Sequence, residues 1–117
     1  MKYIEMLHLN QALIELSDKK MSGGSARLYL NLHNNIQSLE VGIDVFTKAR
    51  EQILKDAENE KDAQRKINEL LQEPCNINLQ SITYSDLEVF EGLTINALNA
   101  LTPILTQEAE PVNVDSL

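Results

Sequence analysis

Residues 25–57 read SARLYLNLHNNIQSLEVGIDVFTKAREQILKDA, and this stretch decides the fold. Its positions at alternating spacings of three and four are apolar, with one exception at Arg50. These positions are Tyr29, Leu32, Ile36, Leu39, Ile43, Phe46, Arg50, Ile53 and Ala57. The spacing predicts a single amphipathic helix of roughly 50 Å. An apolar seam of that length needs another element of the chain, or a second copy, to lie along it.

The residues before this helix predict a shorter partner. Leu9, Ala12, Leu13 and Leu16 repeat at helical spacing, and Asn10 is the expected N-cap. Residues 2–8 fit either a short strand or the first turns of that helix. The loop at residues 21–24 then reverses the chain, and Ser25 caps the long helix.

Two positions within the long helix predict how it packs. Gly42 weakens a helix by roughly 1 kcal/mol relative to alanine, so its presence indicates the close approach of a neighbouring element or a bend. Val41 and Val45 extend the apolar surface beside the seam. We therefore expect the middle of the helix to be buried more widely than its ends.

The charged residues 55–66 allow two interpretations. The long helix continues as a solvated arm, or it breaks near Asn59 and a third helix returns from Asp62 to Gln72. We favour the break, because a continuous helix would place Glu60 and Gln64 on the seam. Asp62 is then the expected N-cap.

The period changes after Pro74. Cys75, Ile77 and Leu79 alternate with polar residues over 75–83, which predicts a half-buried strand. Residues 2–7 and 88–90 are its candidate partners. Thr94 is the expected N-cap of a last short helix, which ends near Pro103.

The predicted fold class is α+β, mostly helical: a long antiparallel helical hairpin with a small two- or three-stranded sheet and a short C-terminal helix. Residues 1–105 form a single domain, and residues 106–117 form an acidic flexible tail.

Composition limits the function. The net charge of −8 and the pI of about 4.6 argue against direct binding to nucleic acid or to anionic membranes. No apolar run approaches the roughly 18 residues of a membrane-spanning helix, and residues 1–10 do not read as a signal peptide. The single cysteine, Cys75, excludes an internal disulfide. We expect a cytoplasmic protein whose acidity serves solubility or docking to a basic surface.

No residue pattern indicates catalysis. His8 and His33 lack metal-ligand spacing, and Cys75 reads as a small buried hydrophobe. We expect no catalytic residue, no cofactor and no metal. Candidate interaction residues are the charged ones that interrupt the seam or cluster outside it: Arg50, Glu58, Glu60, Asp62, Asp86, Glu88 and Glu91.

Two segments carry a resemblance to a known group of proteins. Residues 19–27 form a small-residue loop that leads into a long helix, and residues 49–62 form a charged helical segment. Together with the closing order of strand, turn and short helix, they resemble small acidic proteins of unknown function from phages and prophages of Gram-positive bacteria. The resemblance covers roughly residues 10–105. It implies a phage origin and a helical hairpin with a small β element, and it implies no catalytic residues.

These observations predict a non-enzymatic interaction protein of a phage, acting as a virion-assembly accessory or structural component in the host cytoplasm or the virion. The alternative is a phage inhibitor of a host defence nuclease, whose acidic surface blocks a nucleic-acid-binding site. The expected partner is accordingly a virion component or a host defence protein, and a homodimer along the seam is a further option.

Overall fold

The computed structural model describes residues 1–19 and 23–106. Its helices are α1 (Tyr3–Ser17), α2 (Ala26–Asp56), α3 (Glu60–Leu71) and α4 (Ile95–Leu101), with the 3₁₀ turns η1 (Ser85–Val89) and η2 (Thr102–Ile104). Two short strands, β1 (Ile82–Thr83) and β2 (Leu105–Thr106), pair in parallel. The prediction of a mostly helical chain with a small sheet is confirmed.

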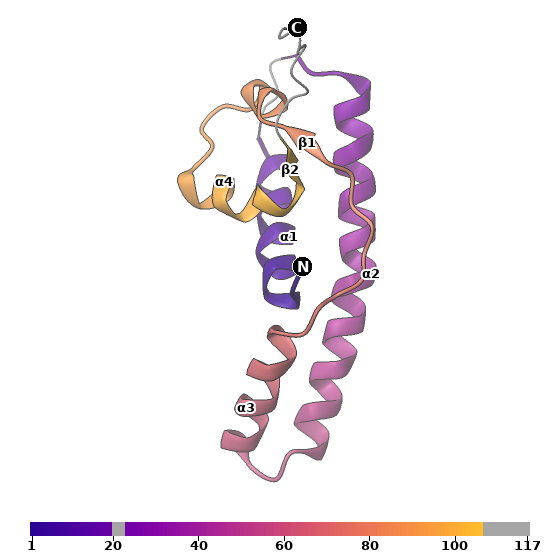
Figure 1. The fold of residues 1–117 in the computed structure, drawn as a ribbon, viewed down its shortest axis with the longest axis vertical. Coiled ribbons are helices and arrows are strands. Elements are labelled where there is room, and N and C mark those ends of the chain that lie inside the picture. Colours follow the sequence, from indigo (N-terminus) through magenta and orange to yellow (C-terminus); the bar gives the residue numbers. More distant parts are fainter. Residues whose placement is uncertain (20–22, 107–117) are drawn as a thin grey trace, which may run out of the picture.

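Helix α2 is the element against which α1 and α3 pack. Helix α1 lies along its first half and α3 along its second half, so the two short helices follow one another beside the long one (Figure 1). The molecule measures 61 × 34 × 23 Å. Because α1 and α3 both contact α2, covering the inner face of α2 does not require a second copy.

The buried face of α2 differs from the predicted seam at its start and its middle. The buried residues are Leu28, Asn35, Leu39, Gly42 and Phe46. The wide apolar flank expected in the middle of α2 is wrong, because Val41 and Val45 are exposed. Tyr29 is 57 % exposed as well. The buried face includes Asn35 and Gly42, which are not apolar seam positions. It therefore lies partly to one side of the predicted seam.

Helix α1 starts earlier than its clearest pattern. It begins at Tyr3, so residues 3–8 form helix rather than strand, and Asn10 lies inside the helix instead of capping it. The backbone N–H of Lys2 donates to Glu5 Oε1 at 2.7 Å, which satisfies one free amide at the helix start. The predicted apolar face is confirmed, since Leu9, Ala12, Leu13 and Leu16 are all buried.

The predicted break near Asn59 is confirmed. Helix α2 ends at Asp56 and α3 begins at Glu60. The predicted cap is wrong: Asn59 is the N-cap, and its side-chain oxygen accepts from the Asp62 N–H at 2.8 Å. Asp62 lies in the first turn of α3, because the helix begins three residues before Ala63, its first apolar residue.

Ser25 and Thr94 are the N-caps that the sequence predicts. Ser25 Oγ accepts from the Leu28 N–H at 3.1 Å at the start of α2. Thr94 Oγ1 accepts from the Ala97 N–H at 3.0 Å at the start of α4. Each hydroxyl satisfies one of the amides that a helix start leaves free.

Residues 75–81, here called the strap, are extended but do not form a strand. Their side chains alternate as predicted, with Cys75, Ile77 and Leu79 half-buried and the residues between them exposed. Only Ile82–Thr83 belongs to a sheet, and its partner is Leu105–Thr106. Both predicted partners are wrong, because residues 3–7 lie in α1 and residues 88–89 lie in η1. Of the predicted pairing with residues 2–7, the described residues show one isolated antiparallel bridge, between Lys2 and Pro74.

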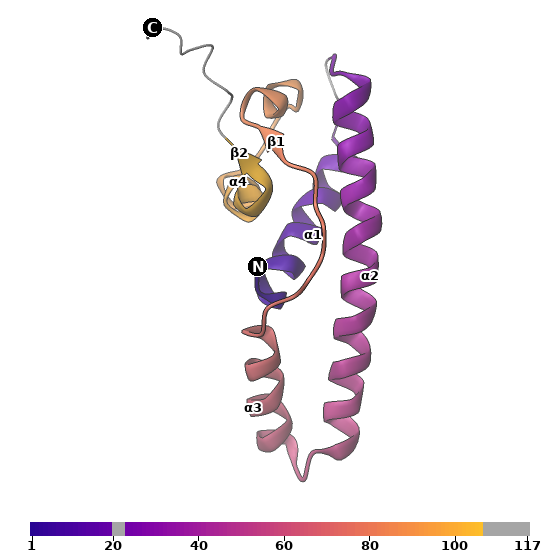
Figure 2. The same ribbon diagram turned by 45° about the vertical axis from the view of Figure 1, so that its right-hand side comes forward.

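The strap packs on α2 instead of on another strand (Figure 2). Asn35, which is fully buried, donates from Nδ2 to the Gln80 carbonyl oxygen at 2.9 Å. In return the Gln80 N–H donates to Asn35 Oδ1 at 2.6 Å. One side chain thus makes the pair of hydrogen bonds that a neighbouring strand would make.

Gly42 makes room for the close packing of α1 and the strap on α2. A Cβ at this position would lie 2.7 Å from Met6 Sδ and 3.2 Å from Ile77 Cγ2. Close approach of neighbouring elements, predicted for this glycine, is therefore confirmed.

The strap leads into a second group of elements, residues 82–106, here called the lobe. It contains β1, η1, α4, η2 and β2, and α4 packs against α1 (Figure 1). The lobe includes Thr106, which lies in β2, whereas the rest of the predicted tail, residues 107–117, lies outside the described residues. Within the described part of the chain, no helix is both long enough and apolar enough to cross a membrane.

We expect Gly42→Val to destabilise the protein although valine is the better helix former. The added atoms overlap Met6 and Ile77 in a buried contact, and overpacking of this kind costs about 1–3 kcal/mol. Urea unfolding followed by circular dichroism measures the effect. Thr47→Val, at an exposed position of the same helix, is the control and should be nearly neutral. Equal stability of the two variants would contradict close packing at Gly42.

We expect Asn35→Leu to lower the free energy of unfolding by about 1–3 kcal/mol, because it leaves both backbone groups of Gln80 without their partner. Asn34→Leu, at the exposed neighbouring position, is the matched control. Amide hydrogen exchange gives a local readout, and the Gln80 N–H should exchange faster in the Asn35 variant only. Unchanged exchange at Gln80 would show that Asn35 does not hold the strap.

Candidate interaction surface

The structure places the seven candidate interaction residues in two separate regions. Glu58, Glu60 and Asp62 lie at the turn between α2 and α3, and Arg50 is exposed on α2 nearby in the chain. Asp86, Glu88 and Glu91 belong to the lobe, at the other end of the molecule (Figure 1). The seven residues therefore do not form one site.

Asp62 has a structural role at the turn. Its carboxylate lies 2.7 Å from Arg65 Nη2 and 3.2 Å from Lys66 Nζ, and it accepts from the Glu58 N–H at 3.3 Å. The hydrogen bond from Arg65, followed by those from Glu58 and Lys66, holds the pKa of Asp62 below its usual value. This carboxylate is occupied by its neighbours within α3 and the turn.

Asp86 is likewise occupied by its local structure. Asp86 Oδ2 accepts from the Thr83 N–H at 2.9 Å, and Thr83 Oγ1 accepts from the Asp86 N–H at 3.2 Å. This reciprocal pair closes the turn from β1 into η1. Of the predicted residues in the lobe, the exposed Glu88 and Glu91 are the ones that remain for binding.

The lobe is distinguished by what its sequence lacks. No lysine or arginine follows Lys66, whereas eight Asp and Glu residues do, and three of them, Asp86, Glu88 and Glu91, lie in the lobe. The first 66 residues contain ten acidic and ten basic residues, so the whole net charge of −8 arises after Lys66. The one described basic contact to the lobe is Lys19, whose Nζ donates to the Gly92 carbonyl oxygen at 3.2 Å. This asymmetry can be read from the positions of lysine and arginine, but the clusters of acidic residues alone do not reveal it.

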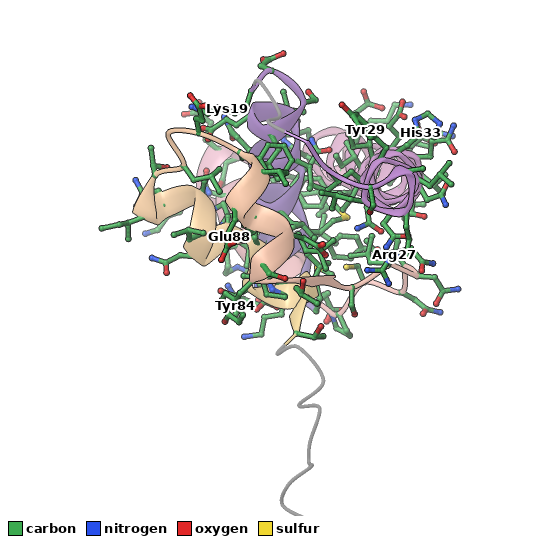
Figure 3. All side chains as sticks on the ribbon, turned by 90° about the horizontal axis from the view of Figure 1, so that it is seen from above. Lys19, Arg27, Tyr29, His33, Tyr84 and Glu88 are labelled. Carbon is green, nitrogen blue, oxygen red and sulfur yellow. The ribbon has the colours of Figure 1, made fainter. Side chains whose placement is uncertain are left out.

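The lobe also exposes large apolar side chains beside its carboxylates. Tyr84 is 56 % exposed and Ile95 is 76 % exposed. Tyr84 and Glu88 lie together on the lobe, away from Tyr29 and His33 on α2 (Figure 3). Exposed aromatic residues are enriched at surfaces that bind other proteins, and a surface of one charge attracts a partner of the opposite charge.

The histidines and the cysteine of the described residues lie on separate elements, with His8 on α1, His33 on α2 and Cys75 in the strap. In residues 1–19 and 23–106, histidine, cysteine and carboxylate side chains form no group of three that could hold a metal ion. Both histidines are exposed. Burial raises the pKa of the Cys75 thiol, which lowers the fraction of thiolate and hence its reactivity.

Comparison with protein-family models, with curated proteins and with solved structures finds no match to this chain. The resemblance to small phage proteins therefore stays a prediction.

We expect Asp62→Asn to destabilise the protein at neutral pH and to have less effect in acid. A carboxyl with a lowered folded-state pKa stabilises the fold above its unfolded pKa of about 3.9, and this contribution is lost as the pH falls through the folded pKa. Urea unfolding at a series of pH values measures the difference. Glu60→Gln, at an exposed neighbouring position, is the control for removal of a carboxylate near the turn. A constant difference between wild type and Asp62→Asn at every pH would contradict the prediction.

Proposed function

We propose that this protein is a non-enzymatic protein–protein interaction module of a phage, acting as a virion-assembly accessory or structural component. The observation that carries the proposal is the acidic lobe, which has no lysine or arginine of its own and exposes Tyr84 and Ile95. A virion or assembly protein with a basic face would be its partner.

The lobe supplies two kinds of binding energy. Glu88 and Glu91 attract a basic surface over a range of about 10 Å at moderate ionic strength and thereby speed association. Tyr84 and Ile95 then bury apolar area, which stabilises the complex once it has formed. Charge sets the choice of partner, and apolar contact adds to the lifetime of the complex.

A second function is favoured by the same absence of basic residues. An inhibitor of a host defence nuclease would place carboxylates where the enzyme binds phosphates, and a lysine or arginine within that surface would oppose binding. The lobe meets this requirement in its described residues, since β1 through β2 contain none.

We further propose that α2 and α3 act together as a long antiparallel helical hairpin, an arm that holds the lobe at a distance from a second contact at the turn with Glu58 and Glu60. Self-association through this arm would give a homodimer with two lobes. The protein would work in the host cytoplasm or within the virion.

Affinity capture of the tagged protein from infected cells tests the proposal. A Glu88→Lys/Glu91→Lys variant should lose its partner, because it reverses two charges of the lobe. A Glu40→Lys/Glu51→Lys variant changes the charge of α2 by the same amount at exposed positions and should keep it. Recovery of virion proteins would support the assembly role, and recovery of a host nuclease would support inhibition. Equal capture by both variants would overturn the role of the lobe.

A further inference from the structure

A groove runs between α1 and α4 on the side of α1 that faces the lobe. It consists of two hollows of about 390 Å³ and 440 Å³. Both hollows are lined by His8, Asn99 and Ala100, so they meet at these residues. Glu15 lines the first hollow and Glu5 lines the second. The groove therefore has a carboxylate toward each end.

The lining of the groove combines small, amide and acidic side chains with His8 in both hollows and with Met1, Thr102 and Pro103 in the second. Ala12 and Ala97 are buried and Ala100 is half-buried, which leaves open space above them. Gln11, Asn96 and Asn99 add carboxamides, each of which can donate and accept hydrogen bonds. Among the residues that the structure describes, no lysine or arginine lines either hollow.

The spacing of the two carboxylates indicates the length of a ligand. Glu5 and Glu15 are ten residues apart on one helix, which corresponds to about 15 Å along its axis. An extended chain covers about 13 Å between residues i and i+4, whose side chains point to the same side. Two basic side chains at that spacing would reach both ends of the groove.

We propose that the groove between α1 and α4 binds an extended, arginine-bearing segment of a partner protein. Guanidinium groups pair with Glu15 and with the Glu5 oxygen that does not accept from the Lys2 N–H, and the carboxamides bind the peptide backbone. The alanines leave room for the aliphatic part of the arginine side chains. The inference rests on the proposed function as an interaction module and adds a second contact beside Glu88 and Glu91.

The charge of the lining selects among ligands. Carboxylates at both ends oppose a nucleic acid or another anion. Carboxylates about 15 Å apart along α1 match two basic side chains of an extended segment at positions i and i+4. Arginine is preferred to lysine because its planar group matches a carboxylate with two parallel hydrogen bonds.

Fluorescence anisotropy with a labelled peptide, Arg-Ser-Ala-Ser-Arg flanked by glycines, tests the proposal at low ionic strength. Replacing both arginines by citrulline, a neutral analogue of the same shape, should weaken binding by about threefold to tenfold or more. Glu15→Gln should weaken binding of the arginine peptide by about twofold to fivefold, whereas Glu40→Gln on α2 should leave it nearly unchanged.

A double-mutant cycle gives the sharper readout. If Glu15 pairs with an arginine of the peptide, Glu15→Gln should have no effect on binding of the citrulline peptide. Ala100→Leu adds bulk where the two hollows meet and should weaken binding of both peptides. Circular dichroism establishes that each variant is folded before its affinity is compared.

Two results would overturn the proposal: equal binding of the arginine and citrulline peptides, or equal effects of Glu15→Gln and Glu40→Gln. Neither result bears on capture of a partner through Glu88 and Glu91. Capture of a partner without peptide binding would overturn the proposal for the groove and leave the proposed interaction module standing. Peptide binding without a captured partner supports the groove and counts against the acidic lobe.

Discussion

The arrangement of the chain depends on one buried side chain, Asn35. After α3 the chain runs extended along α2 with no strand beside it, so its backbone groups need other partners. Asn35 supplies both a donor and an acceptor to Gln80 from within a helix, and it is fully buried. An asparagine whose hydrogen bonds were not made at that position would be costly, which ties the strap to one register. The register of the strap in turn decides where β1 and the lobe begin.

The local signals for the fold could be read from the sequence, but the long-range contacts could not. Caps at Ser25 and Thr94 depend on neighbouring residues, and both are predicted correctly. The alternation of residues 75–81 is also correct, yet it reports which side chains are buried and not what buries them. An extended chain on the side of a helix produces the same period of two as a strand in a half-exposed sheet. The partner is revealed only by Asn35 and Gly42, two residues that a search for apolar positions ignores.

The candidate site shows the same division between local and long-range information. The acidic residues are easy to find in the sequence, but their roles depend on their neighbours. Asp62 and Asp86 are occupied by hydrogen bonds to the backbone and side chains around them, whereas Glu88 and Glu91 are exposed. The position of Lys66 as the last basic residue is a sequence signal that separates these cases in part. Carboxylates well beyond Lys66 have no lysine or arginine near them in the sequence.

The ion pairs and the acidic surface of the lobe lie in different parts of this molecule. The four described ion pairs lie on α2 or α3, between residues 44 and 69, where acidic and basic residues are mixed. The lobe is instead held by caps such as Thr94, by the reciprocal pair of Thr83 and Asp86, and by buried side chains such as Leu101. Its exposed carboxylates thus contribute little to folding, and like charges held near one another oppose it slightly. A surface that keeps such charges without using them for stability is consistent with the proposed binding to an oppositely charged protein, and its net charge also favours solubility.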